Sequence, residues 1–168
     1  MTPSSEKPTP NLIGINRLLK ICREIELVNA LIYEALADQH RENGTIARIW
    51  RQAAREETGH ASQIDLAMRI KRGSFTGAKI EQSEAEEALA VAKGVLARVK
   101  EQPLKIEHAL REAVRMEEHF VRFHAHCACE LAEGATRKLF EALRAGDEAH
   151  VAALEHALEV VTQLGIGR

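Results

Sequence analysis

Residues 57–60 read Glu-Thr-Gly-His, and residues 147–150 read Asp-Glu-Ala-His. Each stretch places an acidic residue three positions before a histidine, which puts both side chains on one face of an α-helix. A further glutamate precedes each stretch by about 30 residues, Glu26 in the first half of the chain and Glu117 in the second. The same set of two acids and one histidine therefore occurs twice, at an offset of about 90 residues.

The residues around these motifs repeat as well. An aromatic residue stands seven positions before the acid of each motif, Trp50 in the first and Phe140 in the second. Tyr33, two helical turns after Glu26, corresponds to His124 in the second half. This repetition predicts two helical hairpins related by an approximate twofold axis, because each hairpin exposes an apolar stripe that a similar partner can bury.

The composition of the chain favours an all-α protein. Aromatic residues make up 4% of the 168 residues, whereas alanine, leucine, glutamate and arginine are abundant. The prolines are Pro3, Pro8, Pro10 and Pro103, so no proline interrupts a helix between Pro10 and Pro103. The length suits a single domain with a full core, built as a bundle of about four to five helices.

Apolar periodicity and breaker residues predict five helical segments. They cover approximately residues 13–40, 45–71, 83–100, 104–132 and 136–164. Turn and stop signals separate them at Asn43-Gly44, Gly73 to Gly77, Gly134, and Gly165 with Gly167. Ser83 and Glu86 form the pattern of a capping box. The connection between the second and third long helices spans about 30 residues, enough to cross the bundle, so the short helix over 83–100 belongs to this crossover.

The N-terminus is polar and proline-rich, and we expect residues 1–12 to form a flexible arm before one domain over residues 13–168. No apolar stretch approaches the roughly 18 residues of a membrane span. The net charge is −2, with acids and bases interleaved, so nothing indicates a surface for nucleic acid or for anionic membranes. We therefore expect a soluble, cytoplasmic protein that binds neither nucleic acid nor membrane.

Six polar side chains interrupt the apolar stripes of the four long helices. They are Glu26, Glu57, His60, Glu117, Asp147 and His150. Burying ionised carboxylates without compensation costs several kcal/mol each, and like charges in one site repel one another. Two divalent cations would cancel the four negative charges, and two neutral imidazoles would complete the ligand set. Carboxylate and imidazole ligands suit iron or manganese, with zinc as a further substitute. The doubled pattern thus predicts a dinuclear metal site.

Alternatives stay open in the second half of this site. Gly146-Asp147 also fits the N-cap of a restarted helix, although the three-residue spacing from Asp147 to His150 favours a continuous one. His124 either binds a metal or hydrogen-bonds a ligand carboxylate, and we expect the second role.

For Tyr33 we expect a hydrogen bond to a ligand carboxylate rather than a radical role. The remaining histidines are interpreted as surface residues; they are His40, His108, His119, His126 and His156.

The chain resembles the ferritin-like superfamily, and most closely its rubrerythrin-type branch. The residues that carry this resemblance are Glu26 with Tyr33, Glu57-Thr58-Gly59-His60, Glu117 and Asp147-Glu148-Ala149-His150. The resemblance covers about Lys20 to Val161. It implies a ferritin-like four-helix bundle, made of two hairpins joined by a long crossover, that holds two iron ions. In that arrangement Glu57 and Asp147 would bridge the irons, Glu26 and Glu117 would be terminal ligands, and His60 and His150 would each cap one iron.

Three positions depart from the pattern of this branch. Asp147 stands where the family has glutamate, which is one methylene longer. His124 replaces the aromatic hydroxyl expected opposite Tyr33. Some rubrerythrins carry an extra acid one turn after the ligand on the third long helix, but here that region holds Phe120 and Val121. The resemblance therefore does not extend to the redox-linked ligand exchange associated with that acid.

The resemblance implies a dinuclear non-haem iron oxidoreductase that reduces hydrogen peroxide or dioxygen, with Tyr33 and His124 as candidate catalytic residues. The chain holds no C-x-x-C pair and hence no rubredoxin-type iron site, so electrons would come from a separate, rubredoxin-like donor protein. Alternatives are an iron-binding or ferroxidase-like protein without turnover, a hydroxylase on the same fold, or a structural bundle with a vestigial polar core. Exposed apolar positions on a bundle often pair two subunits, and we expect a homodimer.

Overall fold

The computed structural model describes residues 11–70, 79–131 and 134–165. Within these ranges the chain forms five helices and no extended strand. They are α1 (Ile15–Gln39), α2 (Gly44–Ile70), α3 (Gln82–Glu101), α4 (Ile106–Glu130) and α5 (Ala135–Leu164). The all-α fold class is confirmed, and those predicted helix bounds that fall on described residues lie within two residues of the observed ones. Several predicted features lie outside the described residues. They are the helix termini at Lys71 and Ala132, the stop signal at 73–77, Gly167, and residues 1–10 of the arm.

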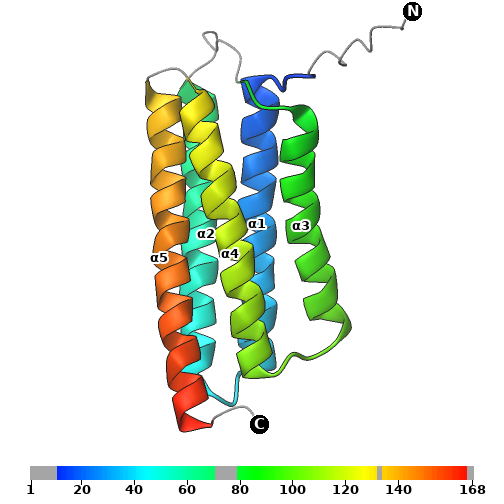
Figure 1. Ribbon diagram of the computed structural model, residues 1–168, viewed down its shortest axis with the longest axis vertical. Helices are drawn as coiled ribbons and strands as arrows, with labels where there is room; N and C mark the ends of the chain where they lie inside the picture. The colour runs from blue at the N-terminus through cyan, green and yellow to red at the C-terminus, as the bar shows by residue number, and fades with distance from the viewer. Residues whose placement is uncertain (1–10, 71–78, 132–133, 166–168) are drawn as a thin grey trace, which may run out of the picture.

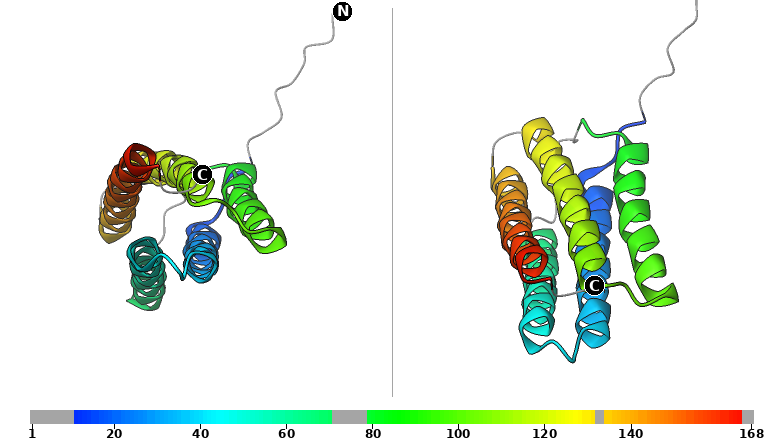
Figure 2. Two further views of the ribbon diagram at one scale, coloured as in Figure 1. Left: turned by 90° about the horizontal axis from the view of Figure 1, so that it is seen from below. Right: turned by 60° about the horizontal axis from the view of Figure 1, so that its bottom comes forward.

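Four long helices lie side by side as a bundle (Figure 1). α1 packs most extensively on α2, and α4 on α5, so the bundle consists of the two expected hairpins. α3 lies outside this bundle, on the side of α1 and α4, within the crossover that joins the hairpins (Figure 2). The arrangement is that of a ferritin-like bundle, and it places the middle turns of four helices around one central volume.

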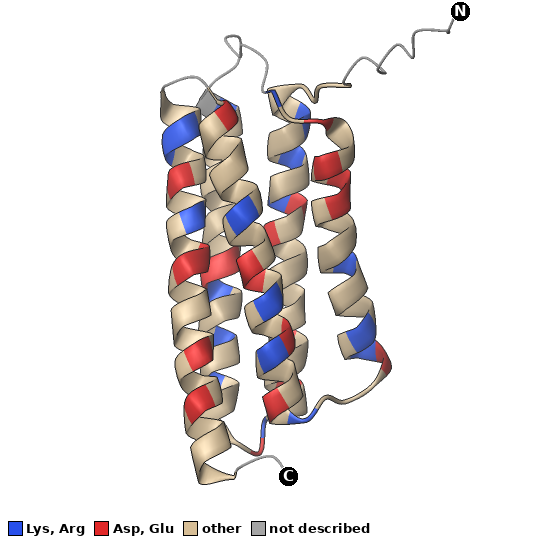
Figure 3. Ribbon diagram, in the orientation of Figure 1, with Lys and Arg blue, Asp and Glu red and all other residues tan. Residues whose placement is uncertain are grey.

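The surface of the bundle carries mixed charge. Lysine and arginine alternate with aspartate and glutamate along the exposed faces of the helices (Figure 3). None of the helices in the described part of the chain is both long enough and apolar enough to cross a bilayer.

The ends of two helices follow from local chemistry. The side-chain Oδ1 of Asn43 accepts a hydrogen bond of 3.1 Å from the backbone N–H of Ile46, which satisfies one of the unpaired donors at the start of α2. Gly165 ends α5 in the left-handed conformation, at φ 63°, which a residue without a Cβ adopts at no steric cost. The turn predicted at Asn43-Gly44 and the helix end predicted at Gly165 are thus both confirmed.

The predicted capping box of α3 is wrong. α3 begins at Gln82, and Ser83 hydrogen-bonds the side chain of Glu81 rather than a backbone N–H. Glu86 instead accepts a hydrogen bond of 2.9 Å from Arg17 of α1. The start of α3 is set by tertiary pairing, because Gln82 donates its backbone N–H to Asn11 at 2.9 Å in a short antiparallel bridge. Residues 11 and 12 of the predicted arm are held by this bridge.

His40 is buried, in contrast to the surface position predicted for it. Its Nδ1 accepts a hydrogen bond of 3.1 Å from the indole N–H of Trp50, and its Nε2 lies 2.8 Å from the carbonyl oxygen of Leu104, to which it donates. The ring therefore ties the turn between α1 and α2 to the end of the crossover. His108 and His156 are exposed as predicted, whereas His119 and His126 are half-buried.

Replacing His40 by alanine is expected to destabilise the fold. The change leaves the Trp50 N–H and the Leu104 carbonyl without their partner, and each buried orphan group costs about 1–3 kcal/mol. We expect the free energy of unfolding, measured by urea denaturation, to fall by about 2–4 kcal/mol. The exposed His108→Ala is the control, and a change of equal size in both variants would show that the buried bonds carry no stability.

Candidate metal centre

The six predicted ligands come together at the middle of the bundle, one acid from each long helix and one histidine each from α2 and α5. Glu26, Glu57, Glu117, Asp147 and His150 are buried, and the side chain of His60 is 12% exposed. They form two groups of four, within each of which ligand atoms lie within 4.8 Å of one another. One group is Glu26, Glu57, His60 and Asp147, and the other is Glu57, Glu117, Asp147 and His150. Glu57 and Asp147 belong to both groups.

Many polar atoms of this cluster are buried without a hydrogen-bond partner in the described part of the chain. They are Oε1 and Oε2 of Glu26, Oε1 and Oε2 of Glu57, Oε2 of Glu117, and one ring nitrogen each of His60, His124 and His150. Such atoms are rare in folded proteins, because each one loses its hydration without gaining a partner. Oxygen and imidazole donors that converge on one volume fit a metal site.

Three acids of the cluster have raised pKa values in the absence of metal. Burial, together with repulsion from Glu57, raises the pKa of Glu26 to about 8. Burial also raises the pKa of Glu117 and of Asp147, although the histidines beside them oppose the increase. Like charges that share a desolvated volume cannot all ionise without a cation.

The two histidines of the cluster also have raised pKa values, which favour their charged form. Burial alone would lower the pKa of His60, but the carboxylates of Glu26 and Glu57, each 3.4 Å from its Nδ1, raise it to about 10. In the same way the carboxylates of Glu117 and Glu57 outweigh burial and raise the pKa of His150 to about 12. Protonated imidazoles therefore balance the carboxylates when no metal is bound.

Two predicted residues lie next to the cluster without belonging to either group of four. His124 lies 2.7 Å from Oδ2 of Asp147 through its Nδ1, and its Nε2 lies 3.6 Å from Glu26. Burial would lower the pKa of His124, but the charge of Asp147 raises it. Tyr33 donates its hydroxyl to Glu117. Both side chains hold a cluster carboxylate in place, and their catalytic roles stay predictions.

Glu56 contacts the cluster from outside and was not singled out from the sequence. Its carboxylate lies 2.8 Å from Nε2 of His150, whose Nδ1 faces Glu57 at 2.9 Å. Burial alone would raise the pKa of Glu56, but hydrogen bonds from Gln52 and His150 lower it. An acid on the far nitrogen of a ligand histidine fixes the ring and its tautomer. The sequence signal was a second glutamate directly before Glu57, but only the fold shows which histidine it reaches.

Gly146 is a second residue whose role the sequence did not reveal. α5 continues from Ala135 to Leu164 without a break, so Asp147 is not the cap of a restarted helix. A Cβ at Gly146 would lie 2.5 Å from Cε1 and 2.6 Å from Nε2 of His60. The imidazole of His60 on α2 occupies the space that a Cβ at this position would fill, so any larger residue would displace the ring.

Comparison with protein families agrees with this geometry. The rubrerythrin family model matches residues 18–158, which contain all six clustered side chains. The chain belongs to the rubrerythrin family. Searches of curated proteins and of solved structures gave no significant match. The family membership accounts for the ferritin-like bundle, and the buried carboxylate and histidine cluster of this rubrerythrin-family chain is compatible with a metal site.

The stability of the metal-free protein is expected to depend on pH. The pKa values of Glu26, His60 and His150 are all raised, so the folded protein binds more protons than the unfolded chain between about pH 5 and 10. Its free energy of unfolding should therefore fall as the pH rises through this window.

Metal binding should reverse this dependence, because the ligands must release their protons. We expect the difference in Tm between protein with Mn²⁺ and protein with chelator to increase from pH 6 to pH 8 in differential scanning fluorimetry. An equal difference at both values would contradict the link between the raised pKa values and metal binding.

Gly146→Ala is expected to impair the centre without unfolding the bundle. The added Cβ forces the imidazole of His60 to move, so the group that contains Glu26 and His60 should lose affinity at least about tenfold, in line with the loss of a positioned ligand. Isothermal titration with Mn²⁺ measures this loss. Gly59→Ala is the matched control, because a Cβ there meets no atom within 4 Å; it should stabilise α2 by up to about 1 kcal/mol and leave metal binding unchanged.

Proposed function

We propose that this protein is a dinuclear non-haem iron oxidoreductase that reduces hydrogen peroxide or dioxygen with electrons from a separate donor protein. The observation that carries the proposal is the pair of four-residue groups that share Glu57 and Asp147. Two shared carboxylates between two terminal sets are the arrangement that a pair of metal ions needs. Membership of the rubrerythrin family supports iron as the metal.

Each residue has a defined place in this proposal. Glu26 and His60 would hold one iron, Glu117 and His150 the other, and Glu57 and Asp147 would bridge them. Two ferrous ions bound there would supply the two electrons that break the O–O bond of peroxide. The surrounding helices keep the carboxylates out of water, which strengthens their hold on a cation.

His124 and Tyr33 would support the reaction from beside the metals. Reduction of peroxide to two waters consumes two protons as well as two electrons. His124 carries a raised pKa and contacts both Asp147 and Glu26, so it can hold a proton where one is consumed. Its bond to Asp147 also orients the shorter bridging side chain. Tyr33 donates its hydroxyl to Oε1 of Glu117 and so fixes the orientation of this carboxylate.

Iron handling without turnover is a second candidate function, favoured by two observations. Phe120, fully buried one turn after Glu117, occupies the region where an additional acid would serve ligand exchange. The chain also lacks a C-x-x-C pair for an electron-transfer iron of its own. A protein of this kind would oxidise iron once per site.

Substitutions at the shared and unshared acids should differ in their effect on iron content. After anaerobic loading with Fe²⁺ and desalting, we expect about two irons per chain in the wild type. Glu57→Ala should lose both irons because its carboxylate serves both groups, whereas Glu26→Ala should retain about one. The control is Glu118→Ala, an exposed residue beside Glu117. Equal iron loss in Glu57→Ala and Glu26→Ala would rule out the shared arrangement.

Peroxide consumption separates catalysis from handling. Iron-loaded protein is mixed with excess hydrogen peroxide and a reduced rubredoxin as donor, and peroxide loss is followed over time. We expect many equivalents of peroxide to be consumed per chain, and His124→Gln to lower the rate by about 10²-fold, the lower end for a general acid, at unchanged iron content. Consumption that stops after one oxidation of the bound iron would favour the handling function.

A further inference from the structure

A cavity between α2 and α5 opens beside the cluster and has no role in the function proposed above. Its volume is about 350 Å³, within the range of small-molecule sites. It is lined by Arg48, Ile49, Gln52, Ala53, Arg55, Glu56, His150, Ala153 and Leu154. Of the six clustered side chains, only His150 lines it, so the cavity reaches the edge of the centre.

The lining combines an apolar wall with two cations. Ile49, Ala53 and Leu154 supply hydrocarbon surface, while Arg48 and Arg55 stand two turns apart on the same face of α2. Neither arginine has a carboxylate partner in the described part of the chain: Arg55 donates to the amide oxygen of Gln52 at 2.7 Å, and no ion pair involves Arg48. Glu56, the one acid in the lining, is held by Nε2 of His150 at 2.8 Å rather than by either arginine.

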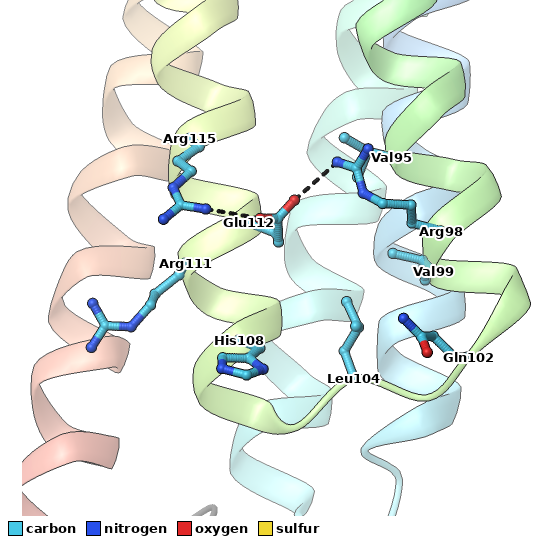
Figure 4. A pocket seen from close by; sticks show the side chains of 9 residues that line it. All are labelled: Val95, Arg98, Val99, Gln102, Leu104, His108, Arg111, Glu112 and Arg115. Atoms are coloured by element: carbon cyan, nitrogen blue, oxygen red, sulfur yellow. Dashed lines mark hydrogen bonds and ion pairs between the residues drawn. The ribbon is translucent and has the colours of Figure 1, made fainter.

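A second cavity provides the contrast. It lies between α3 and α4 near the end of the crossover, with a volume of about 410 Å³, and contains none of the six clustered residues (Figure 4). Its arginines are already paired. Arg98 and Arg115 each lie 3.0 Å from Glu112. Arg111 lies 2.7 Å from Glu107. The arginines of this cavity therefore have carboxylate partners within the protein, whereas Arg48 and Arg55 of the α2–α5 cavity have none in the described part of the chain.

We propose that the α2–α5 cavity binds an amphiphilic organic anion, such as a medium-chain carboxylate. The carboxylate would lie on Arg48 and Arg55, because guanidinium groups pair with carboxylates in charge-assisted hydrogen bonds. The hydrocarbon chain would lie against Ile49, Ala53 and Leu154. Glu56 and His150 form part of the same lining, so the bound anion sits next to a proposed metal ligand. The site is built by protein side chains alone and does not depend on the metals.

Calorimetric titration with octanoate tests the proposal, using both chelator-treated and iron-loaded protein. We expect octanoate to bind both forms. The double variant Arg48→Gln/Arg55→Gln should weaken binding about tenfold or more, the loss expected for a charge-assisted pair. The matched control Arg111→Gln/Arg115→Gln, in the α3–α4 cavity, should bind octanoate as the wild type does. Octanol, which has the chain without the charge, should bind about tenfold more weakly than octanoate.

Filling the cavity gives an independent variant. Ala153 is exposed and small, so Ala153→Leu should occupy the apolar space and abolish octanoate binding at an unchanged Tm. The proposal is overturned if octanoate binds neither form, if octanol binds equally well, or if the α3–α4 control loses binding to the same extent. Octanoate binding by a protein that fails to bind iron would support the cavity and count against the metal centre, so the two failures are distinguishable.

Discussion

The structure depends on holding four carboxylates at one level of a bundle interior. Glu26, Glu57, Glu117 and Asp147 are almost completely buried, although the loss of hydration and mutual repulsion both oppose their burial. Only compensation by protons or by cations allows the helices to close around them. The pKa values of Glu26, Glu117 and Asp147 and those of His60 and His150 are all raised, so protons can balance part of this charge. Two divalent cations would perform the same task with ligands that are already in position.

The groups around the cluster fix its geometry. Tyr33 bonds Glu117, His124 bonds Asp147, and Glu56 bonds His150, so three of the clustered side chains are each oriented by a partner from another helix. The partners come from α1, α4 and α2, which means that the packing of the two hairpins sets the position of the ligands. A buried polar network of this kind specifies one register of the helices, because any shift would leave several groups unpaired.

Much of this arrangement was predictable from the sequence because it rests on periodicity. The doubled motif and the apolar stripes indicated the helices, the hairpins and the inward direction of the acids. Features that depend on contact between distant segments were not predictable. The burial of His40 requires Leu104 to reach it, the start of α3 is set by pairing with Asn11, and the role of Gly146 follows from the ring of His60 on another helix. Local patterns such as the Ser83 capping box fail where such tertiary contacts prevail.

The chain's single tryptophan lies on the same path of contacts as the cluster. Trp50 stacks on Tyr33 with 5.8 Å between ring centroids, and Tyr33 in turn bonds Glu117. The indole is fully buried, so we expect its emission to be shielded from solvent and to respond to changes at the cluster that Tyr33 contacts. The protein thus carries a built-in optical reporter: intrinsic fluorescence can follow occupancy of the interior in unlabelled protein, without any dye or engineered probe.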